Sequence, residues 1–156
     1  MRIAAAGDVV SPDAVLDRLR HRYPGLVQTT TWGERTLLYN PGAASSHGVY
    51  FVTVKERDSA SDAASALDAR GAYRVSFAVA PERYRALFGH LPPRVNASDA
   101  DVDPLAVDRL MPHPLYAWMS WASVVNPSPG TLEELWPLLD ESYALVQSAH
   151  DQRRAG

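Results

Sequence analysis

Two long segments of the chain repeat apolar residues at the spacing of an α-helix. Residues 12–23 place their apolar side chains on one stripe, and residues 131–148 do the same near the C-terminus. Thr131 and Glu134 have the spacing of a capping box, so the second helix is expected to begin there. A shorter helix is expected at 82–88. Each helix should bury one side against another layer of structure.

Between these helices, apolar and polar residues alternate with the period of a β-strand. We predict strands at the following segments: 26–32, 36–39, 49–55, 72–80 and 116–125. The first two are separated by Gly33-Glu34-Arg35 and should form a hairpin. The sequence therefore predicts an antiparallel sheet.

The alternation also assigns side chains to the two faces of that sheet. The core side should carry Tyr50, Val52 and Val54 from one strand, and Tyr73, Val75, Phe77 and Val79 from another. The opposite side should carry Lys55 together with Thr53 and Phe51, and Arg74 together with Ser76 and Ala78. Lys55 would then lie either at the solvent or in a cleft, and a plain surface lysine is the simpler interpretation.

The order of these elements predicts the fold class. One helix, several antiparallel strands, a helix, a strand and a last helix form an α+β two-layer sandwich, with a sheet of about four to six strands packed against two or three helices. The length of 156 residues fits a single domain spanning 1–156.

Composition and charge exclude several classes of protein. The chain has no cysteine, which rules out disulfides and thiolate chemistry. Its net charge of −3, without an internal basic run, argues against nucleic acid as a partner. No segment is long and apolar enough to span a membrane and the N-terminus does not have the pattern of a signal peptide, so we expect a cytoplasmic protein.

The most unusual stretch is 110–127, where a histidine lies between two prolines and is followed by three large aromatic residues. The prolines Pro112 and Pro114 restrict the backbone on both sides of His113, which should fix the direction of its ring. If 116–125 is a strand, Tyr116, Trp118 and Ser120 share one face, and Met119, Trp121 and Ser123 share the other. At least one indole would then lie outside the main core and could line a pocket.

These positions give the candidate site. We take His113 as a general acid/base near neutral pH, and Lys55 and Arg74 as groups that stabilise negative charge on a bound acid, enolate or phenolate. The candidate binding residues are aromatic or amide side chains: Trp32, Tyr116, Trp118, Trp121 and Asn126. The competing interpretation is structural, with a hydrogen-bonded histidine and a tryptophan-rich seam of the core.

The sequence points to no cofactor and no metal. The five histidines lack the spacing of metal ligands, and a mixed site of His113 with Asp101, Asp103 or Asp108 is the alternative left open. Ser46 and His47 adjoin in sequence but would diverge in space, so no serine-type triad is expected. The acidic run that includes Asp99 lacks the glycine and glutamate of a calcium loop.

Four segments resemble a known family. They are TWGERTLLYNPG at 31–42, LDARGAYRVSF at 67–77, YRALFG at 84–89 and LMPHPLYAWMSWASVVNP at 110–127. Together they are similar to an actinobacterial domain-of-unknown-function family, number 6194. The segment ESYALV at 141–146 is similar, more distantly, to the last helix of MmcQ/YjbR-like proteins. This second resemblance implies an α+β fold of double-wing, DNA-binding-like shape and no established activity.

Two functions follow from these observations. The first is a small-molecule-binding protein of bacterial specialised metabolism, either a cofactor-independent enzyme or a sequestering or resistance protein, with an aromatic pocket around His113. The alternative is an interaction or DNA-binding module without catalysis. Exposed strand edges or aromatic patches would also be compatible with a homodimer.

Overall fold

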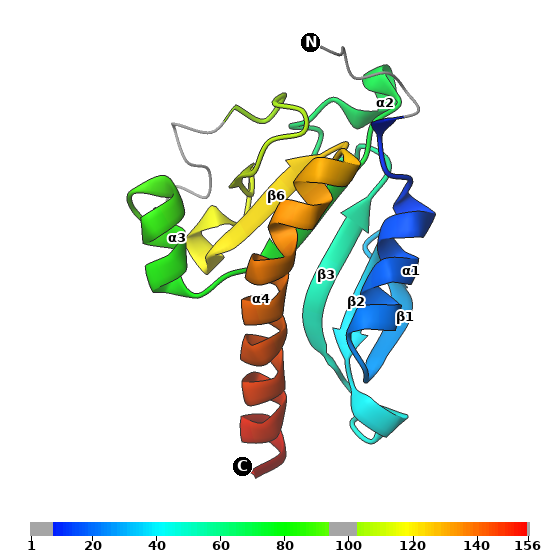
Figure 1. Cartoon of the computed structure of the whole chain (residues 1–156), viewed down its shortest axis with the longest axis vertical. Coiled ribbons are helices and arrows are strands. Elements are labelled where there is room, and N and C mark those ends of the chain that lie inside the picture. Colours follow the sequence, from blue (N-terminus) through cyan, green and yellow to red (C-terminus); the bar gives the residue numbers. More distant parts are fainter. Residues whose placement is uncertain (1–7, 94–102, 156) are drawn as a thin grey trace.

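The computed structural model describes residues 8–93 and 103–155, which form one antiparallel sheet with helices packed on one of its faces (Figure 1). The sheet contains six strands in the order β1-β2-β3-β4-β6-β5. They are β1 (Leu26–Thr31), β2 (Glu34–Tyr39), β3 (Val49–Lys55), β4 (Arg74–Ala78), β5 (Met111–Pro112) and β6 (Trp121–Val125). The predicted α+β class and the antiparallel sheet are confirmed.

Among the described residues, four α-helices and the 3₁₀ turns η2 and η3 accompany the sheet. The helices are α1 (Pro12–Arg22), α2 (Leu67–Arg70), α3 (Pro81–Phe88) and α4 (Pro129–Ala155), and the turns are η2 (Pro41–Ala43) and η3 (Ala117–Met119). Figure 1 shows α1 and α4 on the same face of the sheet. Within the part of the chain that the structure describes, no helix is long and apolar enough to cross a membrane.

The main core lies between this face and the helices. It contains the predicted apolar side chains of β3 and β4, including Val52, Val54, Val75 and Phe77, and the α1 stripe of Val15, Leu16 and Leu19. The predicted faces of Tyr50 and Phe51 are wrong. Phe51 is fully buried in this core, whereas Tyr50 is 42% exposed. The cause is an irregularity between Leu37 and Leu38, where the pairing with β3 skips one residue and reverses the alternation at that point.

The element boundaries differ from the predictions in three places. The hairpin turn consists of Trp32 and Gly33, since Thr31 pairs with Glu34. Helix α4 begins at Pro129 and is capped by Ser128, whose hydroxyl accepts a hydrogen bond from the backbone of Thr131 at 3.2 Å, so the capping box predicted at Thr131 is wrong.

The third difference concerns the predicted strand 116–125. Only residues Trp121–Val125 are extended, and the preceding Ala117–Met119 form a 3₁₀ turn that ends at Ser120 with a φ of 67°. The alternation predicted for Tyr116 and Trp118 therefore does not hold. A single turn of helix at this point lets the chain reverse direction and pair β5 with β6.

Candidate functional site

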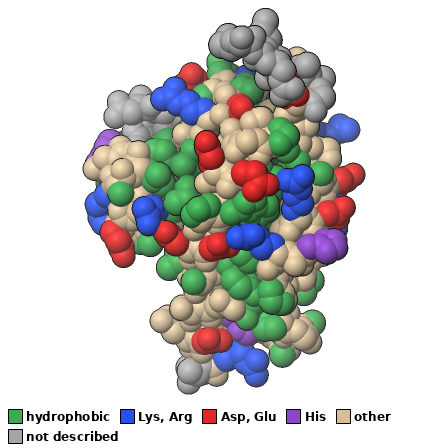
Figure 2. Space-filling view, in the orientation of Figure 1, with side chains coloured by type: hydrophobic (Ala, Val, Ile, Leu, Met, Phe, Trp, Pro, Cys, Tyr) green, Lys and Arg blue, Asp and Glu red, His purple; other side chains and the backbone are tan. Residues whose placement is uncertain are grey.

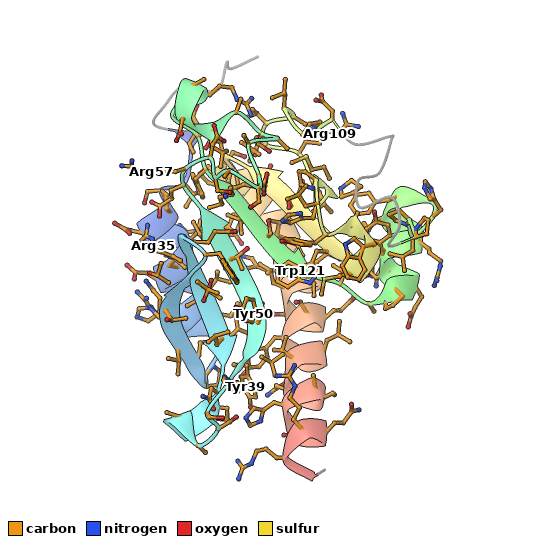
Figure 3. All side chains as sticks on the ribbon, turned by 180° about the vertical axis from the view of Figure 1, so that it is seen from behind. Arg35, Tyr39, Tyr50, Arg57, Arg109 and Trp121 are labelled. Atoms are coloured by element: carbon orange, nitrogen blue, oxygen red, sulfur yellow. The ribbon has the colours of Figure 1, made fainter. Side chains whose placement is uncertain are left out.

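The face of the sheet turned away from α1 and α4 carries mostly polar side chains, and we call it the polar face. Neighbouring strands place two rows on it, which consist of Thr36, Thr53, Ser76 and Ser123, and of Lys55, Arg74 and Val125. Apart from Thr53, all of these side chains are buried. Figure 3 looks onto this face, and among the described residues no long helix covers it. Because no long helix shields these polar side chains, other segments of the chain must account for their burial.

Two segments enclose this face: the connection at 56–66, and residues 103–120, which include the edge strand β5 and the turn η3. Asp58 anchors the first segment, because its carboxylate accepts a hydrogen bond from the backbone of Leu67 at 2.9 Å at the start of α2. Arg70 then joins both segments by donating to the carbonyls of Ser65 and Leu105, the second at 2.8 Å. The polar face is thus enclosed by loops that are tied to each other, which is a common construction for binding sites.

Arg74 is the most deeply buried charge on the polar face, with 1% of its surface exposed. Its guanidinium forms an ion pair with Asp62 and donates to the hydroxyl of Ser65 at 3.0 Å. Burial alone would raise the pKa of Asp62, but the hydrogen bond and charge of Arg74 outweigh it and hold that pKa below its usual value. The Nε atom of Arg74 has no hydrogen-bond partner among the described residues.

Lys55 lies directly opposite Arg74 in the sheet, and only 3% of its surface is exposed. Its ammonium group donates to the hydroxyl of Ser59 at 3.0 Å. The carboxylate of the half-buried Glu34 is close enough to interact electrostatically with both Lys55 and Arg74. Desolvation raises the pKa of Glu34, and the attraction of Lys55 and then of Arg74 opposes that rise. The surface-lysine interpretation of Lys55 is therefore wrong.

His113 enters the same region from the segment that follows β5. Its backbone donates to Trp121 at 3.0 Å, which extends the β5–β6 pairing by one residue. Its Nδ1 atom accepts from the backbone N–H groups of Leu115 and Tyr116, both at 3.0 Å. This arrangement requires a lone pair on Nδ1 and leaves the ring proton on Nε2.

The charge state of His113 follows from the same surroundings. Burial, then repulsion by Arg74, lowers the pKa of His113 to about 3. The ring is therefore neutral near pH 7 and presents Nε2–H as a hydrogen-bond donor. This geometry suits a fixed donor to a ligand oxygen, as in an oxyanion hole, better than the general acid/base role that the sequence suggested.

The predicted aromatic residues do not all reach this site. The ring of Tyr116 lies 4.9 Å from that of His113, and Trp121 lies on the polar face opposite Ala78. Trp118 belongs to η3 and is partly buried. Trp32 stands at the tip of the β1–β2 hairpin with 89% of its surface exposed, so it shares no pocket with His113. Nothing in the sequence pattern separates Trp32 from Trp121, because both are tryptophans beside strands.

Asn126 has a structural role in the fold. It adopts a left-handed backbone with a φ of 48°, and its side-chain oxygen accepts from the backbone of Tyr73 at 3.0 Å. This bond closes the end of the β4–β6 pair just beyond Arg74 and Val125. Asn126 thereby fixes the position of the site without facing it.

Several polar residues around Lys55, Arg74 and His113 were not predicted from the sequence. Ser76 and Ser123 face each other across β4 and β6 with their hydroxyl oxygens 2.7 Å apart, and the alternation in these strands could have indicated that pair. Asp62 and Ser65 lie in a polar loop with no periodic signal, so nothing in the pattern singles them out. Of the acidic residues considered with His113, Asp108 accepts from the backbone of Ser128 at 2.7 Å and Asp103 from that of Leu105 at 3.1 Å, and Asp101 lies outside the described residues.

The opposite side of the molecule offers a different surface. An open groove between α1 and α4 is lined by Asp17, Arg18, His21, Arg22, Glu133 and Trp136. Figure 2, which views this side, shows basic and acidic side chains interspersed. Arg22, for example, pairs with Asp140 at 3.1 Å and lies 4.8 Å from the Trp136 ring. These charges are already neutralised by one another, so the polar face remains the better candidate site.

Metal binding finds no support in the described ranges, where no group of three or more histidine and acidic side chains is placed to hold an ion.

Comparison with curated proteins and with solved structures returns no match. A family model does match, over residues 10–155, and it is described as a family of unknown function, DUF6194. The match covers nearly the whole chain, including every strand of the sheet and all of the polar face. The chain therefore belongs to this family.

Proposed function

We propose that the protein binds a small organic molecule at the polar face, between the sheet and the loops 56–66 and 103–120. The observation that carries this proposal is the burial of Lys55, Arg74 and His113 on one side of the sheet, away from the main core. Burying two cations beside each other costs free energy unless partners compensate them. A ligand that is polar at one end and aromatic or apolar at the other would supply such compensation.

The surroundings of the cluster support a ligand of this kind. Beyond the row of Thr36, Thr53, Ser76 and Ser123, on the side away from Lys55 and Arg74, the polar face continues to Ala78 and Trp121, both only partly buried. Tyr116 and Met119 are 46% and 49% exposed at the rim. A ligand whose polar group reaches Lys55 would place its remaining atoms against these side chains, where aromatic contact stabilises binding.

The described surface gives less support to nucleic-acid binding. Several of its arginines are paired with carboxylates: Arg22 with Asp140, Arg35 with Asp13 and Glu56, and Arg83 with Glu141. Paired arginines do not form the basic footprint that phosphates require. The double-wing relationship to MmcQ/YjbR-like proteins stays a prediction, as do the actinobacterial origin and the role in specialised metabolism.

Native mass spectrometry of the protein purified from its source cells tests the proposal. We expect a bound small molecule, and we expect Trp121→Ala to lose it while Trp32→Ala keeps it. Trp32 is the matched control because it is the same residue type at an exposed hairpin tip. Equal loss in both variants, or equal retention, would place the compound elsewhere and would refute the site.

A further inference from the structure

The two buried cations of the polar face retain hydrogen-bond donors for which residues 8–93 and 103–155 supply no acceptor. An ammonium group has three N–H donors, and Lys55 directs one of them to Ser59. Arg74 uses both terminal nitrogens on Asp62 and Ser65, whereas its Nε–H is buried without an acceptor in the described part of the chain. A buried donor of a charged group left without an acceptor is costly, so an acceptor from outside the chain is expected.

The charges of the cluster indicate what that acceptor is. Lys55 and Arg74 contribute two positive charges, and Asp62 compensates one of them by direct contact with Arg74. Glu34 is near Lys55, since its neighbour Arg35 pairs with Val54 and Glu34 therefore comes next to Lys55 in the register. His113 adds a neutral N–H donor on the same face. With Glu34 protonated, one positive charge stays uncompensated, and it calls for one negative charge with two acceptor oxygens.

We propose that the site recognises a carboxylate group of its ligand, held by the Lys55 ammonium, the Arg74 Nε–H and the His113 Nε2–H. This inference rests on the proposed function and names the class of ligand. A carboxylate fits because it carries a single charge and two oxygens that accept charge-assisted hydrogen bonds. A dianionic phosphate would exceed the one positive charge that remains when Asp62 is ionised and Glu34 is protonated.

Glu34 acts as the intramolecular competitor of that carboxylate. The charged groups that influence it are Lys55, Arg74 and Asp62, and Thr53 donates a hydrogen bond to it. When a second carboxylate approaches Lys55, repulsion favours the protonated form of Glu34. Ligand binding should therefore be accompanied by proton uptake, and affinity should rise as the pH falls from neutral toward the range in which Glu34 is protonated.

Acetate and acetamide are suitable probes, because they have nearly the same shape and differ in charge. In nuclear magnetic resonance titrations of the full chain, we expect acetate to shift the Arg74 Nε–H resonance with saturation at millimolar concentrations, and acetamide to leave it unchanged. Lys55→Met should weaken acetate binding by at least about ten-fold. Glu34→Gln should tighten binding at neutral pH and remove its pH dependence, whereas the exposed Glu82→Gln should change neither.

Each result decides the question. Equal shifts with acetate and acetamide, or none with acetate, would overturn the carboxylate assignment. Should Lys55→Met fail to fold, the wild-type comparison and Glu34→Gln still decide it. If a neutral compound is bound beside Trp121 and acetate does not shift the Arg74 Nε–H resonance, this inference is refuted and the proposed function stands. Acetate binding at Arg74 in a protein that carries no organic compound at Trp121 would refute the proposed function, and with it the ligand class inferred from it.

Discussion

Lys55 and Arg74 are directly paired residues of neighbouring antiparallel strands, and their side chains lie on the same face of the sheet with 3% and 1% of their surfaces exposed. Like charges opposite each other in a sheet are destabilising. Asp62 is in direct contact with Arg74, and the half-buried carboxylate of Glu34 lies near Lys55. This arrangement is unfavourable for stability alone and is explained if the cations serve binding.

The Arg74–Asp62 ion pair makes the first prediction. Asp62→Asn removes the negative charge while preserving the shape, and it leaves the Arg74 charge buried without compensation. We expect a loss of about 3–5 kcal/mol in the free energy of unfolding, measured by urea titration. Asp17→Asn, which breaks the exposed pair with Arg20, should cost less than about 1 kcal/mol. Similar losses in both variants would contradict the importance of burial.

A second prediction concerns the pH dependence of stability. His113 stays neutral in the folded protein, because burial and Arg74 lower its pKa to about 3, while in the unfolded chain it gains a proton near its ordinary pKa of 6.5. Between these values the unfolded state binds more protons, so stability falls as the pH falls. The slope from this group is about 1.4 kcal/mol per pH unit below pH ~6.

His113→Asn isolates that contribution. The Asn side-chain oxygen can accept the two backbone hydrogen bonds now received by Nδ1, but it does not titrate. The difference in unfolding free energy between wild type and variant should therefore change with pH by this slope between pH ~6 and pH ~5. Other titrating groups are common to both proteins and cancel. A constant difference across this range would show that the imidazole is protonated in the native state.

The sequence predicted the layers of the fold well because they depend on periodicity. The stripe of Val15, Leu16 and Leu19 and the alternation in 72–80 each follow from burying one side of an element, and both are confirmed. Placing Lys55 and Arg74 on the same face also followed from a period of two. Boundaries were less certain where a single backbone angle decides them, as at Ser120.

The composition of the site was predictable only in part. Strand residues such as Arg74 could be placed because their faces are set by the pleat. Asp62 could not, since its position depends on how the loop 56–66 folds back over the sheet and on its ion pair with Arg74. The role of His113 could not be derived either, because its tautomer depends on the backbone N–H groups of Leu115 and Tyr116, which only the turn after Pro114 brings together.

The hairpin tip gives a third prediction. Trp32 and Gly33 have φ values of 55° and 79°, which are those of a type I′ turn, and a tryptophan is strained in this conformation. Trp32→Asn should raise the unfolding free energy by several tenths of a kcal/mol, up to about 1 kcal/mol, because asparagine favours that position. Thermal unfolding measures the effect. The variant should also keep the bound compound, and a loss of binding would restore Trp32 to the site.

The hydroxyl pair of Ser76 and Ser123 gives the last prediction, by a double-mutant cycle. Both residues are buried and their oxygens lie 2.7 Å apart. Either single change to alanine leaves the other hydroxyl without that partner and should cost about 1–3 kcal/mol, whereas the double change should cost much less than the sum. Ser142→Ala is the control, because this buried hydroxyl has no partner among the described residues and its removal should not destabilise the protein. Additive losses at 76 and 123 would show that each hydroxyl acts alone, and the polar face would then lack the rigid hydrogen-bonded floor beneath the proposed carboxylate site.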